Sequence, residues 1–234
     1  MNLRTGPAGR RSIQRLLAAA SLAFICARPA LSDEAWARIQ GKIVAVDGAT
    51  LLVRLKERSL EGKILRQRYG ETVEARLKDS VVITAVIPAE LSGVKQGRLV
   101  GVTYVPNTNG ALEAVEVHLY PAAQEGFDGR VMKSDFAPGS VLTEGNVQSL
   151  ANSDGNLTLT ISDGKDPPTL QTIDVNAKTP TFAFTPGSIE DLKPGASVIL
   201  RNISNSGGGV WNAPKYFYVG RSGIELPMMW TLPP

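Results

Sequence analysis

Apolar and polar residues alternate in short runs along most of this chain, and turn residues separate the runs. Segments 41–46 and 51–56 flank Asp47 and Gly48, a dipeptide that favours a tight hairpin turn between two strands. Residues 73–77 alternate apolar with charged side chains, which is typical of a strand with one face in water. Short strands at regular spacing predict an all-β protein built from small closed or nearly closed barrels.

The first 32 residues do not follow this pattern. A basic start leads into an uncharged apolar run at 16–27, and small residues at 30–32 suit a cleavage site. This order predicts a secretory signal peptide, so the mature protein is expected to be periplasmic or secreted. Arg10 and Arg11 fit a twin-arginine route as well as the general secretory route, and Cys26 leaves a lipoprotein as an alternative. The run is shorter than the ~20 residues of a membrane span, which favours a cleaved leader over an anchor.

One stretch of the pattern occurs twice. Residues 81–97 hold an apolar strand, a proline, a short polar stretch and a Lys-Gln-Gly turn, and residues 179–195 repeat that order with Lys-Pro-Gly. Similarity at a fixed offset indicates repeated units, here two tandem small β-barrels joined by a linker. The predicted boundaries are 1–32 for the signal peptide, 36–120 for the first barrel domain, 121–138 for the linker, 139–222 for the second barrel domain and 223–234 for an apolar C-terminal tail.

The remaining predicted elements complete both domains. Only short helical turns are expected, at 88–92 and 188–192. The further strands are expected at 81–87, 99–105 and 114–120 in the first domain, and at 145–150, 157–161, 171–175, 181–184, 197–202 and 210–219 in the second.

Removing the leader changes the charge of the protein. The whole chain has 25 Lys and Arg against 22 Asp and Glu, but five of the arginines and no acidic residue lie in the leader. The mature chain therefore has a net charge of −2, and whole-chain basicity does not favour a nucleic-acid partner. The single Cys also lies in the leader, so the mature chain has no disulfide. Since no later apolar run reaches spanning length, an integral membrane protein is not expected.

Turn and core residues of both domains resemble those of a family of bacterial exported proteins of unknown function. The matching positions are Gly41, 46–48, 50–53, 88–91, Lys95, Gly97, 116–118, Pro121, 138–140, 192–195 and 220–221. The resemblance implies barrels similar to the oligonucleotide/oligosaccharide-binding (OB) fold and brings no established activity. The chain departs from the family in a longer first hairpin segment, 57–70, and in Ser134, Asp135 and Phe136, where a His and a Trp are expected.

Basic residues concentrate in the first hairpin and third strand, where eight Lys and Arg stand against four acidic residues between Arg54 and Lys78. Such a group favours an anionic partner, for example a surface glycan, a lipid head group or an acidic protein. Nucleic acid is not favoured, because the first domain has few aromatic residues on which bases could stack. The predicted ligand-binding residues are Arg54, Lys56, Arg66, Arg68 and Tyr69.

Aromatic residues and methionines concentrate near the C-terminus. These residue types are frequent at protein interfaces, and they are equally suited to the core of the second barrel. The predicted partner-binding residues are Trp211, Met228, Met229 and Trp230.

His118 is the only histidine, and residues two apart on a strand share a face, so Glu116 is its natural companion. These two are the weak candidates for a metal site, which would need further ligands. The mature chain has neither a Cys nor a Gly-x-Ser-x-Gly motif, which points away from nucleophilic catalysis and leaves only a Ser–Lys pair open.

Together these features predict an exported, non-catalytic binding or scaffolding protein of the cell envelope, without a cofactor. The expected partner is an envelope protein or an anionic surface ligand. The alternatives are a glycan- or metal-binding accessory protein and, third, a hydrolase.

Overall fold

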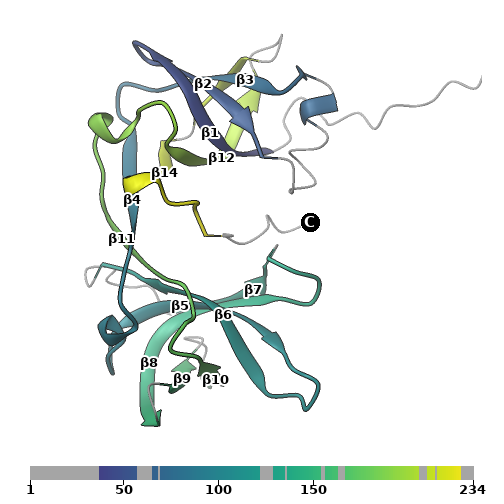
Figure 1. Ribbon diagram of the computed structural model, residues 1–234, viewed down its shortest axis with the longest axis vertical. Coiled ribbons are helices and arrows are strands. Elements are labelled where there is room, and N and C mark those ends of the chain that lie inside the picture. The colour runs from purple at the N-terminus through teal and green to yellow at the C-terminus, as the bar shows by residue number, and fades with distance from the viewer. Residues whose placement is uncertain are drawn as a thin grey trace, which may run out of the picture. The chain divides into compact units, whose positions relative to one another are not determined.

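The computed structural model describes residues 37–56, 65–67, 69–121, 129–134, 136–153, 156–162, 167–205, 210–213 and 215–227 (Figure 1). All of these belong to one unit, Asp33–Pro234. The predicted signal peptide lies outside the described residues. The described chain is all-β, with only short helical turns, which confirms the all-β part of the predicted fold class.

Every predicted strand has a counterpart in the structure. The described strands are β1 (Ala37–Asp47), β2 (Thr50–Leu55), β3 (Thr72–Arg76), β4 (Val82–Pro88), β5 (Leu99–Pro106), β6 (Leu112–Leu119), β7 (Arg130–Lys133), β8 (Val141–Ser153), β9 (Asn156–Ser162), β10 (Leu170–Val175), β11 (Thr181–Pro186), β12 (Ser197–Asn205), β13 (Val210–Asn212) and β14 (Tyr216–Gly220). Two strands differ from the prediction: β7 lies in the expected linker, and 210–219 divides into β13 and β14. The single-turn helices are η1 (Leu91–Gly93), η2 (Ile189–Asp191) and η3 (Arg221–Gly223), and residues 65–67 and 69 are also helical.

Five strands close into a ring that we call barrel A. The order is β1-β2-β3-β13-β12, and β12 pairs back to β1. Neighbours are antiparallel except β3 and β13, which run parallel. The inward-facing side chains form one hydrophobic core, in which Val53, Leu200 and Phe217 are almost completely buried.

A second ring, barrel B, has the same plan. Its order is β8-β9-β10-β6-β5, with β5 pairing back to β8, and the single parallel pair is β10 with β6. Its core includes Val102, Leu159 and Ile173, all without solvent exposure. The closed barrel expected from the spacing of the strands is thus present.

Each barrel takes strands from both halves of the chain. Barrel A combines β1 to β3 with β12 and β13, whereas barrel B combines β5 and β6 with β8 to β10. The boundaries predicted at 36–120 and 139–222 therefore enclose two stretches of sequence that each contribute to both barrels.

Two strands connect the barrels. β4 and β11 run antiparallel beside each other, with Val86 opposite Phe184, and Figure 1 shows both as long connecting strands. β4 continues the pairing parallel to β14, and β11 runs parallel to β6. A third hydrophobic cluster surrounds them, formed by Val86, Leu99, Tyr120, Leu142, Phe184, Ile199 and Leu226. The connection between the barrels is consequently both hydrogen-bonded and packed.

The same glycine contact occurs in each barrel. A Cβ placed on Gly41 would stand 2.0 Å from the carbonyl oxygen of Arg54, and a Cβ on Gly145 would stand 1.8 Å from that of Ser162. No side chain fits at such a distance, so both hairpins depend on glycine for their close strand contact.

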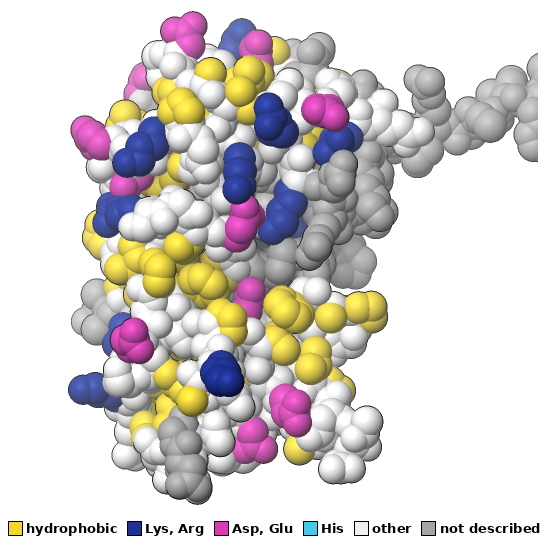
Figure 2. Space-filling model, viewed as in Figure 1, with side chains coloured by type: hydrophobic (Ala, Val, Ile, Leu, Met, Phe, Trp, Pro, Cys, Tyr) yellow, Lys and Arg dark blue, Asp and Glu magenta, His cyan; other side chains and the backbone are white. Residues whose placement is uncertain are grey.

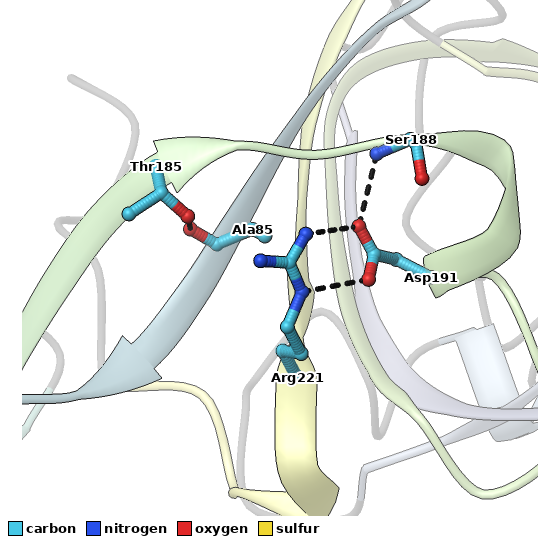
Figure 3. A network of polar contacts seen from close by, with 5 residues as sticks. All are labelled: Ala85, Thr185, Ser188, Asp191 and Arg221. Atoms are coloured by element: carbon cyan, nitrogen blue, oxygen red, sulfur yellow. Dashed lines mark hydrogen bonds and ion pairs between the residues drawn. The ribbon is translucent and has the colours of Figure 1, made fainter.

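An arginine next to a strand end contacts each of the two helices η1 and η2. Arg221 donates Nε to Asp191 Oδ1 at 2.8 Å and Nη2 to Oδ2 at 2.7 Å, while the Ser188 amide donates to the same Oδ2 (Figure 3). At η1, Arg98 donates to the backbone carbonyl of Gly93 at 2.9 Å instead. The two ends of the molecule thus hold matching helices with different chemistry.

Candidate functional site: a basic hollow on barrel A

The predicted basic residues separate into two groups in the structure. Arg54 and Lys56 line a common hollow, whereas Arg66 forms an ion pair with Glu71 at 3.1 Å. Tyr69 packs edge-on against Trp211, with ring centroids 5.8 Å apart, as part of the core of barrel A. Arg68 lies outside the described residues. Only part of the predicted ligand-binding set therefore forms one site.

The hollow has a volume of about 670 Å³. The strands β1 and β2, the turn before β12 and the extended segment after η3 provide its walls. The lining residues are Gln40, Gly41, Lys42, Ile43, Val44, Arg54, Leu55, Lys56, Pro194, Gly195, Ser197, Glu225 and Leu226.

Three cations share one face of the β1–β2 hairpin. Lys42 and Arg54 are direct cross-strand partners, and Lys56 follows Arg54 by two residues, so all three side chains point to the same side. Like charges directly opposite on a sheet repel each other and destabilise the pair. The hairpin therefore carries a local charge that an anion would stabilise.

Among the residues that the structure describes, Glu225 supplies the one carboxylate that lines the hollow. Its Oε1 lies 2.7 Å from Lys42 Nζ, and its Oε2 lies 3.6 Å from Lys56 Nζ. The hydrogen bond from Lys42 is the main reason that the pKa of Glu225 falls below its usual value. Arg54 is exposed and has no ion pair with any residue in the described ranges. One negative charge thus faces three positive charges.

Barrel B lacks these cations at the matching positions. Asn146 follows Gly145 as Lys42 follows Gly41, and each pairs with the first residue of the next strand in its ring, Leu99 or Ser197. Ser162 takes the place of Arg54, since its carbonyl approaches Gly145 in the same way. At the described positions that match, the cross-strand cations thus occur in barrel A and have no counterpart in barrel B.

The charge difference extends over the surface. Figure 2 shows Lys and Arg side chains gathered over the half of the visible face where Figure 1 places β1, β2, β3 and β12, and few of them over the half with β5, β6 and β8.

Sequence reasoning missed Lys42 and Glu225. In a regular hairpin closed by Asp47–Thr50, Lys42 would face Leu55 and not Arg54. A bulge between Ile43 and Ala45 shifts the register by one residue and brings the two cations to one face.

The predicted partner-binding residues are not on a described surface. Trp211 is 4% exposed and lies in the core of barrel A. Met228, Met229 and Trp230 lie outside the described residues. The described part of the tail, up to Pro227, contributes the buried Leu226 and the exposed Glu225.

The candidate metal ligands are buried on β6, on the opposite face from Val117 and Leu119, which belong to the core of barrel B. His118 is completely buried, and its Nε2 lies 3.6 Å from Glu116 Oε2. The rings of Phe182 and Phe184 pack against the imidazole, with centroids 6.5 and 5.6 Å away. Within the described ranges, no three His, Cys, Asp or Glu side chains gather closely enough to hold a metal ion.

A second polar group lies near the connecting strands and was not anticipated. The buried carboxylate of Glu144 accepts hydrogen bonds from the Tyr120 hydroxyl and from Arg130 Nε. Burial, followed by the charge of Glu144, raises the pKa of Tyr120 well above its ordinary value, so the phenol stays protonated and donates. Glu144 occupies on β8 the place that Gln40 has on β1. Each lies directly before the glycine that makes the close hairpin contact, Gly145 or Gly41.

No known protein family, curated protein or solved structure matches the chain. Among the described residues no helix has the length and apolar character needed to cross a membrane.

Proposed function

We propose that this chain is an exported, non-catalytic binding protein of the cell envelope, and that barrel A holds an anionic ligand in the hollow formed by Lys42, Arg54 and Lys56. The observation that carries the proposal is the cross-strand pair Lys42 and Arg54, which faces an open hollow of about 670 Å³ and of which only Lys42 contacts a described carboxylate, that of Glu225.

Two physical arguments support this function. A ligand anion between Lys42 and Arg54 removes the repulsion that the free hairpin carries. The volume lies within the range of roughly 300–1,000 Å³ that is typical of small-ligand sites. Ile43, Leu55 and Leu226 add an apolar wall, so the site suits a ligand with both charged and apolar surface.

We further propose that both barrels are OB-like copies of one repeated unit that have exchanged their last strands. The shared strand order, the parallel pair in each ring and the matching glycines support two copies of one design. The repeated sequence stretch forms β4 and η1 at 81–97 in one copy, and β11 and η2 at 179–195 in the other. OB barrels bind oligosaccharides and oligonucleotides, which fits a ligand-binding role.

The export assignment depends on the leader and on the resemblance to bacterial exported proteins. An exported protein meets acidic glycans and phosphorylated polymers at the cell surface. Closely spaced negative charge is the chemistry that these ligands share.

Calorimetry on residues 33–234 tests this function with two probes, an alginate oligosaccharide for carboxylates and tripolyphosphate for phosphates. We expect one probe to bind the wild type and Arg54→Gln to weaken that probe by about tenfold, the loss of one charge-assisted contact. Lys178→Gln removes an equal charge from an exposed turn beside barrel B and serves as the matched control. Equal binding by both variants, or binding of neither probe, would rule the site out.

A further inference from the structure

We infer that Glu225 is a built-in competitor for the anion site, which occupies Lys42 and Lys56 until a ligand anion replaces it. This inference rests on the proposed function and assigns a regulation to the same hollow.

The carboxylate of Glu225 contacts two lysines at once. The two carboxylate oxygens of Glu225 point to different lysines, at 2.7 Å from Lys42 and 3.6 Å from Lys56. A ligand carboxylate or phosphate that binds between Lys42 and Arg54 needs the Lys42 ammonium group that Glu225 holds, and one that reaches Lys56 needs both. Ligand and Glu225 cannot both hold this pair of lysines.

The Glu225 side chain can leave without unfolding its segment. The side chains of Glu225 and Lys42 are 56% and 54% exposed. Ion pairs between exposed groups contribute only about 0–1 kcal/mol to stability, so this one can open at little cost. The neighbouring Leu226 is 3% exposed and belongs to the cluster around the connecting strands. The backbone therefore stays anchored beside the hollow while the carboxylate moves.

The backbone before Glu225 is also fixed. Gly220 lies so close to the carbonyl oxygen of Ile224 that a Cβ on the glycine would stand 2.7 Å from it. The Ile224 amide donates to the Arg221 carbonyl at 3.5 Å, at the end of η3. These contacts hold residue 225 opposite β1 in a constant position, as a competitor within the chain requires.

The test compares residues 33–234 with Glu225→Gln, which keeps the shape of the side chain and removes its charge. Each protein is titrated with the alginate oligosaccharide and with tripolyphosphate. We expect Glu225→Gln to bind the responsive probe about three- to tenfold more tightly, because a weak ion pair and a neighbouring like charge are both lost. Glu113→Gln, an exposed change on barrel B, corrects for the change in net charge.

The outcomes separate this inference from the proposed function. If the wild type binds and Arg54→Gln weakens binding, but Glu225→Gln behaves as Glu113→Gln does, the competitor role is wrong and the anion site stands. Weaker binding by Glu225→Gln would show that the side chain assists the ligand and would also overturn the competitor role. If neither probe binds any of the proteins, the site and its competitor both fail. Unchanged circular dichroism and unfolding temperature confirm that Glu225→Gln is folded.

Discussion

Barrels A and B share one strand order and one glycine contact, yet their strands carry opposite charge. In the strands that the structure describes, barrel A has five basic and two acidic residues, whereas barrel B has four acidic residues and neither Lys nor Arg. The barrel requires alternation, a glycine at the hairpin contact and a parallel closing pair, and both rings meet those requirements. These charged side chains are not needed for closure, so their difference points to separate roles for the two barrels.

Separating the two halves of the chain should have the largest effect, because both barrels take strands from each half. Residues 33–128 and 129–234 each hold three of the five strands of one barrel and two of the five strands of the other. Neither half can therefore complete a core. We expect each half alone to lose cooperative unfolding entirely, and an equimolar mixture to recover it as a one-to-one complex. Circular dichroism and light scattering on a sizing column measure both properties. A half that folds alone as a monomer would show that each stretch of sequence can close its own barrel.

The shared glycine contact gives the next largest effect. Gly41→Ala and Gly145→Ala both force a Cβ against a backbone oxygen, and we expect each to lower the free energy of unfolding by about 3 kcal/mol or more. Gly48→Ala is the control, since its positive φ of 53° costs about 1–2 kcal/mol without any close atom. Urea unfolding gives all three values. Equal losses at Gly41 and Gly48 would mean that the hairpins do not depend on the close contact.

The buried carboxylate near the connecting strands sharpens the comparison, because barrel A has the neutral Gln40 where barrel B has Glu144. Tyr120→Phe removes one of the donors to Glu144, and hydrogen bonds to buried charged groups contribute about 1.5–3 kcal/mol. We expect a loss in that range, again by urea unfolding. Tyr104→Phe is the matched control. Within the described ranges the Tyr104 hydroxyl has one side-chain hydrogen bond, accepted from the neutral Thr143 at 3.4 Å, so a loss of about 1 kcal/mol or less is expected. Equal losses would mean that the charge of Glu144 does not strengthen its bond.

The sequence predicted the strands well, because alternation and turn dipeptides are local signals. Asp47-Gly48 indicates the first hairpin, and the proline and Lys-x-Gly patterns indicate η1 and η2. The partners of those strands are not local. Nothing in residues 99–119 specifies that β5 and β6 close around β8 to β10, since any apolar strand of suitable length satisfies the same core.

The candidate site was half predicted for a similar reason. Arg54 and Lys56 belong to a visible basic stretch, but Lys42 joins them only through the bulge in β1. Glu225 joins them only through packing of Leu226 against a cluster that both barrels build. Long-range contacts of this kind leave no pattern in a single sequence.

The smallest effect is expected at the arginine contacts of η1 and η2. Only the contact at η2 includes a group that titrates, the carboxylate of Asp191. Arg221 lowers the pKa of Asp191, so this contact stabilises the fold fully above the usual Asp pKa of about 3.9 and is lost as the pH falls through the lower folded value. At pH 6, Asp191→Asn should lower the free energy of unfolding by about 1 kcal/mol, as loss of a helix cap does. The deficit should shrink below about pH 4, where the unfolded chain takes up a proton at this residue, and it should disappear as the pH falls through the lower pKa of Asp191 in the folded protein.

Arg98→Met tests the other helix, where the acceptor is the Gly93 carbonyl and carries no titrating proton. Its deficit should therefore stay constant between pH 6 and pH 3, measured by urea unfolding beside Asp191→Asn. Only the Asp191 contact contains a carboxylate. If the loss in free energy of unfolding shrank equally in both variants at low pH, the pH dependence would come from the whole protein and not from Asp191. A constant deficit in both would mean that the charge of Asp191 adds nothing to the hydrogen bonds, and that the two helices are fastened alike in spite of their different residues.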